Sequence, residues 1–340
     1  MRMTSLLRIA ALGLLASAAS AGTAVADGVE LRMATMAPDG TSSVKILAKA
    51  SAELQSKTER RVTVKYDAGG AHGDDRDRVR KLGLGQLDGA ALSSAGLAMI
   101  DTSILVLELP RLFATVEEFD HVADKMWPSF QKKFEAKGYK LQDRGEVGWS
   151  YFVSKSEIKS LAALKSLKAW LGSDDSLVRA LYKKLGVSGV PLGVPEVEPN
   201  LTTGRINTAY GSPLTAVALQ WSSKVKYMSS LPINYAIGGT VINVTALEKV
   251  SAADQALIAK VALTTSTTLR KQIRMDNGSA KKQMERNGVV ITEAPADMIA
   301  GFDKAAKEVW KELTGKLYTK AELELVLKYR DEYRAKNLAK

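Results

Sequence analysis

Few residues of this 340-residue chain are equipped for catalysis. The chain has no cysteine, which excludes disulfides, thiolate metal sites and cysteine nucleophiles. His72 and His121 are its only histidines, and they are too far apart in the sequence for a two-histidine metal site with helical spacing. No G-x-S-x-G segment marks a serine nucleophile. The sequence therefore argues against an enzyme, and His72 is interpreted as a loop residue.

Three neighbouring carboxylates, Asp74, Asp75 and Asp77, have the composition of a site for a hard metal ion. Helix capping explains them more simply, because Asp74 or Asp75 stands just before a helical segment whose first N–H groups need acceptors. Gly83-Leu-Gly85 lacks the third glycine and the preceding strand of a dinucleotide-binding loop. The sequence thus predicts no metal site and no cofactor.

The remaining chemistry is that of aromatic side chains. In LKSLKAWLGSDD, residues 164–175, Trp170 stands where a short strand meets a polar turn. An indole at this position offers a large apolar face and one N–H donor. Packing in the core or between lobes explains the residue as well as ligand contact does, and both interpretations stay open at this point.

Alternating strands and helices must position these residues. In the first part of the chain, strands are expected over 30–36, 61–66 and 87–92, with helices over 41–57 and 76–84 between them. This β-α-β-α-β order implies a parallel sheet with helical crossovers.

The second half of the chain also alternates between strands and helices. Strands are expected over 140–143, 149–154, 167–171, 206–210 and 289–292, and helices over 176–185, 196–203, 251–287 and from 296 to the end. The helical pattern over 251–287 would reach about 50 Å, which is longer than one small domain. We therefore expect an α/β protein with two lobes, a bracing helix that spans both, and a small-molecule cleft between them.

The first 26 residues have the pattern of a secretory signal peptide. Arg2 and Arg8 lie around the start of an apolar run over 9–15, and Ala24-Val-Ala26 forms a cleavage site. The run is too short to span a bilayer, and no cysteine follows it to carry a lipid anchor. We expect a soluble exported protein that is cleaved after Ala26, with a buried N-terminal helix as the alternative.

The charge of the chain is basic but dispersed. Its 48 basic and 37 acidic residues give +11, and about +9 remains once Arg2 and Arg8 leave with the signal segment. The basic residues are interleaved with acids along the helices, and only residues 328–340 are locally basic. This distribution is typical of a solvated surface, so no nucleic-acid partner is predicted.

Several segments together resemble the periplasmic substrate-binding subunits of TRAP transporters, the dicarboxylate- and sialic-acid-binding group. In chain order they are Ala71-His-Gly-Asp-Asp-Arg76 with Leu82 and Gly85-Gln-Leu-Asp88, Leu109-Pro110 with Phe113, Leu164-Lys-Ser-Leu-Lys168, Glu196-Val197 with Leu201-Thr-Thr-Gly204, and Gly211-Ser-Pro213. Their order and spacing match the family over residues 29 to about 315, although no single motif is decisive.

The resemblance implies both a fold and a function. It implies two α/β lobes with hinge strands, lobe I from 27–147 and 238–277, and lobe II from 148–237 and 278–340. It also implies that a periplasmic protein captures a small-molecule ligand in the cleft, closes, and delivers the ligand to TRAP-type membrane permease subunits. Closure would be a population shift, in which the ligand stabilises the closed state through contacts found only there.

The sequence departs from the family at the ligand-binding arginine. In the family the segment LKGLKIR ends in an arginine that binds the ligand's carboxylate, whereas Trp170 occupies this position here. Burying a carboxylate without a cation is costly, so we expect an apolar or aromatic ligand, including a lipid-like one. The site residues predicted from the resemblance are Trp170, Trp149, Tyr151, Tyr210, Ser212, Tyr235, His72 and Arg76.

Three alternatives stay open from the sequence. First, another cation replaces the missing arginine and the ligand is a carboxylate; Arg76, Lys168, Arg205 and Arg111 are the candidates. Second, the protein carries a lipid or hydrophobic metabolite through the periplasm, or serves a sensor, with a periplasmic scaffold protein in place of a permease. Third, an exported hydrolase would be revealed by turnover of generic esters.

Overall fold

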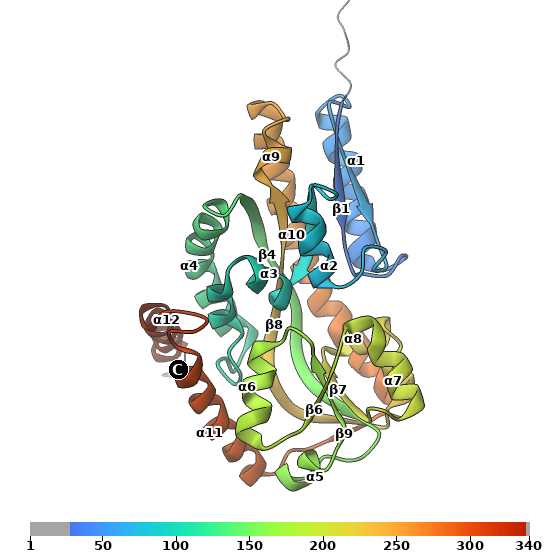
Figure 1. Cartoon of the computed structure of the whole chain (residues 1–340), viewed down its shortest axis with the longest axis vertical. Coiled ribbons are helices and arrows are strands. Elements are labelled where there is room, and N and C mark those ends of the chain that lie inside the picture. The colour runs from blue at the N-terminus through green and yellow to red at the C-terminus, as the bar shows by residue number, and fades with distance from the viewer. Residues whose placement is uncertain (1–27, 338–340) are drawn as a thin grey trace, which may run out of the picture.

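The computed structural model describes residues 28–337, so the predicted signal peptide, residues 1–26, lies outside the described residues (Figure 1). The strands are β1 (Val29–Ala34), β2 (Val62–Asp67), β3 (Gly89–Ser93), β4 (Tyr139–Ser154), β5 (Ala169–Gly172), β6 (Gly189–Leu192), β7 (Thr208–Gly211), β8 (Tyr227–Asn243) and β9 (Val290–Thr292). The α-helices are α1 (Ser42–Lys57), α2 (Asp75–Gly83), α3 (Ser94–Ile100), α4 (Val116–Glu135), α5 (Leu161–Lys165), α6 (Ser176–Leu185), α7 (Val197–Thr203), α8 (Pro213–Ala218), α9 (Val244–Leu247), α10 (Ala252–Arg286), α11 (Ala296–Leu313) and α12 (Lys320–Asn337). Three 3-10 helices are η1 (Thr102–Glu108), η2 (Val194–Glu196) and η3 (Trp221–Lys224).

Lobe I is built on the predicted β-α-β-α-β unit. β1 pairs in parallel with both β2 and β3, which confirms the expected parallel sheet. The Thr41 hydroxyl caps α1 by accepting from the Val44 N–H, and Asp74 caps α2 by accepting from the Asp77 N–H. Capping thus accounts for part of the acidic cluster that follows the glycine-rich loop.

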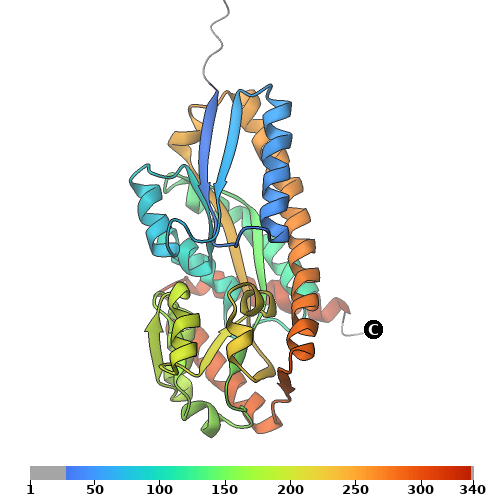
Figure 2. The ribbon, with the colours of Figure 1, turned by 90° about the vertical axis from the view of Figure 1, so that its right-hand side faces the viewer.

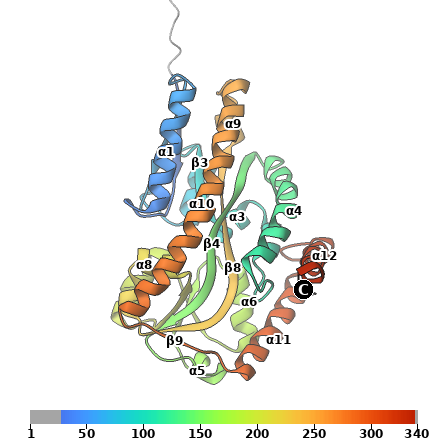
Figure 3. The same ribbon diagram turned by 180° about the vertical axis from the view of Figure 1, so that it is seen from behind.

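Two long strands join the lobes. β4 and β8 are 16 and 17 residues long, pair antiparallel, and run from one lobe into the other (Figures 1 and 3). The sequence predicts two separate strands in place of β4, because Arg144-Gly-Glu-Val-Gly148 has the composition of a break; the structure carries the strand through it with irregular pairing. The sequence analysis does not predict β8 at all.

Lobe II continues the same sheet on the far side of β4. The strand order within the described residues is β2-β1-β3-β8-β4-β7-β5-β6, and β9 pairs with β8. β5 pairs in parallel with β6 and β7, and α6 spans Ser176–Leu185, as predicted. Asp175 caps α6 by accepting from the Val178 N–H, and Gly186 ends it with a φ of 69°, which a glycine adopts without strain.

The bracing helix is α10. Its 35 residues correspond to a length of about 52 Å, and it runs along the back of the molecule from α1 in lobe I to α8 in lobe II (Figures 2 and 3). This confirms the long helix predicted over 251–287. No helix within residues 28–337 is long and apolar enough to cross a membrane.

The observed architecture confirms the predicted α/β fold with two lobes, hinge strands and a brace. The lobe bounds given above stay a prediction, since β4 and β8 belong to both lobes and the chain has no single crossing point. The C-terminal helices pack on the protein: α12 lies against α4, and the Trp310 N–H donates to the carbonyl of Pro110 at 2.9 Å.

Candidate functional site

A cavity of about 190 Å³ lies where the two lobes meet beside β4 and β8. Lobe I contributes the start of α2, the β3–α3 junction and the end of η1, while lobe II contributes β5, β7 and the turns that follow them. The polar and aromatic side chains that line the cavity are Asp74, Asp75, Ser93, Ser94, Glu108, Ser150, Trp170, Ser173, Asp174, Asp175, Tyr210, Ser212, Thr215, Trp221 and Asn234. We call this cavity the interlobe cleft.

The wall of the cleft in lobe II is aromatic. Trp170 stacks on Tyr210 with ring centroids 4.5 Å apart and meets Trp221 edge-on at 5.4 Å. The Trp170 N–H donates to the carbonyl of Leu192 at 2.9 Å, so the indole donor is already used inside lobe II. With only 5% of its surface exposed, Trp170 is both a packing residue and a lining residue, and the two interpretations from the sequence are not exclusive.

Two aspartates stand beside these rings at the turn after β5. Asp175 accepts hydrogen bonds from the Tyr210 hydroxyl at 2.6 Å and from the Val178 N–H at 2.9 Å. Burial raises the pKa of the Asp175 carboxyl, and these hydrogen bonds oppose that shift. Asp174 is paired with Arg76, which reaches over from α2 in lobe I.

The opposite wall holds Glu108, at the end of η1, and Asn234, on β8. Glu108 is 7% exposed; its carboxylate accepts from the Ile237 N–H at 2.9 Å and from Asn234 Nδ2 at 3.0 Å. The pKa of Glu108 is raised to about 8, mainly by burial and also by the charge of Asp175, against the hydrogen bonds from Ile237, Ser94 and Asn234, which lower it. Glu108 and Asp175 are thus two acidic side chains that line the same cavity.

Direct contacts between the lobes hold the cleft closed at its rim. The Arg76–Asp174 ion pair joins α2 to the turn after β5. Next to it, Asp75 is bound by Arg78 and by Ser93, so that its charge is compensated within lobe I. Arg76 thus has a place at the rim, and its observed partner is a carboxylate of the protein.

The structure brings together only part of the predicted site. Trp170, Tyr210 and Ser212 line the cleft, and Arg76 lies at its rim. The buried Ser212 hydroxyl caps α8 by accepting from the Thr215 N–H, which gives it a structural role as well.

Trp149, Tyr151 and Tyr235, which the sequence places at the site, do not line the interlobe cleft. Successive side chains on a strand point to opposite faces, and here Ser150, Asn234 and Ala236 take the cleft face of β4 and β8. Trp149 instead packs against Tyr235 with ring centroids 5.0 Å apart, and the Tyr235 hydroxyl donates to Glu146 at 2.8 Å. A ligand contact of these three rings stays a prediction that the lining of the cleft does not support.

His72 is also outside the cleft lining. Its Nε2 lies 2.8 Å from Asp67 at the end of β2, and the Lys81 ammonium donates to its backbone carbonyl. This anchors the loop before α2, which is consistent with a loop residue and gives it no contact with the cavity.

The other candidate cations are likewise placed elsewhere. Arg111 pairs with Asp303 of α11 at 2.7 Å, and Lys168 and Arg205 are exposed and do not line the cleft. Among the described residues, no group of three or more acidic, histidine or cysteine side chains is arranged to hold a metal ion.

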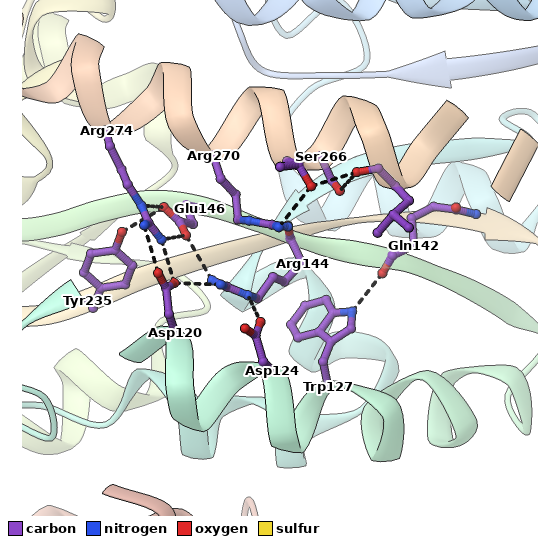
Figure 4. Close-up of polar contacts among 12 residues, drawn as sticks. Asp120, Asp124, Trp127, Gln142, Arg144, Glu146, Tyr235, Ser266, Arg270 and Arg274 are labelled. Atoms are coloured by element: carbon purple, nitrogen blue, oxygen red, sulfur yellow. Dashed lines mark hydrogen bonds and ion pairs between the residues drawn. The ribbon is translucent and has the colours of Figure 1, made fainter. Parts of the chain in front are cut away.

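Behind the cleft, the hinge strands carry a dense ionic network (Figure 4). Glu146 on β4 is fully buried and binds Arg144 and Arg274, and the same two arginines bind Asp120 of α4. The pKa of Arg274 is raised, since these carboxylates outweigh the burial that lowers it. This set, which we call the hinge network, ties α10 and α4 to the strand that both lobes share.

The acidic side of the cleft was not predicted from the sequence. Asp174 and Asp175 were expected only in a polar turn, and no role was expected for Glu108 and Asn234. A signal was present for Glu108, because a single carboxylate interrupts the apolar run Ile104-Leu-Val-Leu-Glu-Leu109, where burial is expected.

The fold and the cleft together define a two-lobed solute-binding protein. The sequence model of the family described as "Bacterial extracellular solute-binding protein, family 7" matches residues 33–316. The chain belongs to this family, whose members are the periplasmic solute-binding subunits of TRAP transporters; they are receptors and not enzymes, which confirms both predictions.

Known proteins similar to this chain are distant in sequence. The uncharacterized protein YiiZ of Salmonella typhimurium is 23% identical over 275 residues, which is 78% of this chain and 79% of YiiZ. A TRAP solute-binding protein of Bradyrhizobium, in complex with galacturonate, has a TM-score of 0.81 at 23% identity and covers 89% of this chain and 99% of its own. A sugar acid binding protein of Advenella mimigardefordensis, in complex with galactonate, has a TM-score of 0.84 at 19% identity, with coverages of 90% and 99%.

The expectation of a hydrophobic ligand finds no support in these observations. The similar structures hold polar sugar acids, and the cleft of this chain combines its aromatic wall with carboxylates and an amide. An apolar molecule that filled the cleft would leave the buried Oδ1 atom of Asn234 without a partner and would offer nothing to the two acids.

Proposed function

We propose that this protein captures a small solute in the interlobe cleft and delivers it to a TRAP-type membrane permease from the periplasm. The observation that carries the proposal is a cavity lined from both lobes, which meet at the Arg76–Asp174 pair and share the strands β4 and β8. A ligand in such a cavity contacts both lobes only when they are closed, and it therefore favours the closed state. Cleavage after Ala26 and release into the periplasm are part of this proposal.

The ligand that fits the lining presents an apolar or aromatic face to Trp170 and Tyr210 and polar groups to the opposite wall. The rings supply contact area, and the buried polar groups supply orientation. The proposed ligand still contacts the aromatic residues expected from the sequence. It is not wholly apolar, however, but has one apolar or aromatic side and one polar side.

Uptake into proteoliposomes tests the transport role. TRAP-type permease subunits of the same organism are reconstituted, and a labelled solute that binds the mature protein in a prior screen is added with and without the protein. Uptake that requires both the protein and an ion gradient supports the proposal. Solute binding without protein-dependent uptake would favour the periplasmic carrier or the sensor-associated protein instead.

A further inference from the structure

The charge of the interlobe cleft points to a class of ligand, an inference that rests on the proposed solute-binding function. Glu108 and Asp175 line the cleft from opposite walls, and neither forms a salt bridge within the described part of the chain. Their partners are neutral: Asn234 and the Ile237 N–H for Glu108, and Tyr210 with the Val178 N–H for Asp175. Two carboxylates thus share one cavity without a cation between them.

A second observation is independent of these acids. Asn234 is 5% exposed and lines the cleft, and its Oδ1 atom has no hydrogen-bond partner. The orientation of the amide follows from its contacts with Glu108, because Nδ2 lies 3.5 Å from the backbone carbonyl oxygen, which can only accept, and 3.0 Å from the side-chain carboxyl. A buried carbonyl oxygen without a donor is costly, so a donor from the ligand is the missing partner.

The basic side chains near the cleft already have partners within the protein. Arg76 is paired with Asp174, and Arg78 with Asp75. Arg179 donates to the carbonyl of Ser173 and acts on Asp175 only through its charge at longer range. The basic residues therefore compensate the two aspartates at the rim and leave Glu108 and Asp175 without a paired cation.

The aromatic wall suits the same kind of ligand. The faces of aromatic rings attract cations, most strongly in the case of an indole. Trp170 and Tyr210 are stacked on each other beside Asp175, so a positive group there meets both a carboxylate and π-electron density.

We propose that the interlobe cleft binds a small organic cation, with an ammonium group donating to Glu108, Asp175 and Asn234 Oδ1 and an apolar or aromatic body against Trp170 and Tyr210. A carboxylate in the same position would face two acids and an unpaired carbonyl oxygen and would bring no donor. A bare metal ion is a poorer fit, since the acids that line the cleft are not gathered into a metal-binding group within residues 28–337.

The test uses three probes of one shape and different charge. Benzylamine, benzyl alcohol and benzoate are titrated into the full mature protein by calorimetry, with galacturonate as a fourth probe. We expect benzylamine to bind at least about tenfold more tightly than benzyl alcohol, which corresponds to one charge-assisted hydrogen bond, and we expect no binding of benzoate.

Two variants locate the binding site. Glu108→Gln and Asp175→Asn keep the shape of the side chain but remove the charge and replace one acceptor oxygen by an amide donor. The asparagine side chain of the second variant can still cap α6. Each is expected to weaken benzylamine about tenfold while its melting temperature confirms that it is folded. Glu285→Gln, which removes an exposed charge of α10 outside the cleft, is the matched control and should bind as the native protein does.

Other outcomes overturn the inference and leave the transport role untouched. Benzoate or galacturonate binding as tightly as benzylamine would show that the cleft accepts acids. Amine binding that both cleft variants retain would place the amine elsewhere, and no binding of benzylamine at about 10 mM, a concentration that detects even millimolar affinity, would exclude this class of ligand. The uptake experiment with the labelled solute judges the transport role separately.

Discussion

The hinge network and the interlobe cleft are two acidic regions of one molecule, and they differ in how their charges are met. In the hinge network, Glu146 and Asp120 are bound by Arg144 and Arg274, and β4, α4 and α10 are tied together as a result. In the cleft, Glu108 and Asp175 have hydrogen-bond donors but no cation. A buried carboxylate that is paired with arginines cannot be removed without leaving those arginines unpaired, whereas one that has no paired cation is available to a ligand.

The strongest way to break this comparison is to remove the centre of the hinge network. Glu146→Ala leaves Arg144 and Arg274 short of a carboxylate in a buried place, and we expect the free energy of unfolding to fall by about 3–5 kcal/mol. Urea denaturation measures the change. Asp124→Asn is the control, because the Asp124 side chain is 68% exposed, and a surface change of this kind costs about 0.5 kcal/mol or less. Equal effects of the two variants would contradict a central role for Glu146.

In the cleft, removal of a carboxylate should raise the stability at higher pH, whereas removal of Glu146 from the hinge network should lower it. The pKa of Glu108 in the folded protein is about 8, above the ordinary value of 4.5, so between these values the folded state binds more protons than the unfolded chain. Its contribution to stability is complete below about pH 4.5 and is lost as the pH rises towards 8.

The Glu108→Gln variant has no titratable group at this position, so the loss of stability with rising pH should not occur. Relative to the native protein, the variant should gain more than about 1 kcal/mol in unfolding free energy between about pH 5 and pH 8, measured by urea denaturation at each pH without ligand. The groups that face Glu108 are Asp175, Asn234, Ser94 and the Ile237 N–H, and none of them is a cation. A difference between the two proteins that stays constant with pH would mean that Glu108 is ionised throughout.

A smaller effect is expected at the aromatic wall. Trp170→Phe keeps an aromatic ring beside Tyr210 but removes the N–H that donates to the carbonyl of Leu192. Loss of this bond and of part of the buried ring should cost about 1–2 kcal/mol of unfolding free energy. Trp310→Phe loses a comparable bond to Pro110 far from the cleft and is its control. Only Trp170→Phe should also weaken ligand binding.

The smallest effect on stability is expected at the rim. The Arg76 side chain is 68% exposed, so Arg76→Ala should leave the melting temperature nearly unchanged. It should nevertheless open the protein, because the Arg76–Asp174 pair joins the two lobes. Small-angle scattering of the ligand-free variant is expected to give a larger radius of gyration than that of the native protein. A radius equal to that of the native protein would mean that other contacts determine closure.

Much of the fold follows from patterns that are local in the sequence. The predicted ends of α1, α6 and α10 lie within a residue or two of those observed, because capping residues and apolar spacing mark them. β8 was missed, since Pro232, Gly238 and Gly239 have the composition of breaks. The structure accommodates Pro232 at an irregular part of the pairing with β4, which the sequence of one strand alone does not reveal.

The site could be predicted only in part. Trp170 and Tyr210 were found because the resemblance gives their place along the chain, but the face that a strand residue occupies depends on register and bulges, and β4 is irregular. The role of Glu108 depends on contacts with Asn234 and Ile237, which are 126 and 129 residues away, and no local pattern indicates such contacts.

Because β4 and β8 pass through both lobes, the two lobes are not independent folding units. Each lobe uses parts of the chain from before and after the crossing, so no single cut separates a self-sufficient lobe from the rest. The two halves are expected to melt in one cooperative calorimetric transition. Any opening of the lobes is therefore expected to bend the paired strands β4 and β8, because these strands are continuous from one lobe to the other.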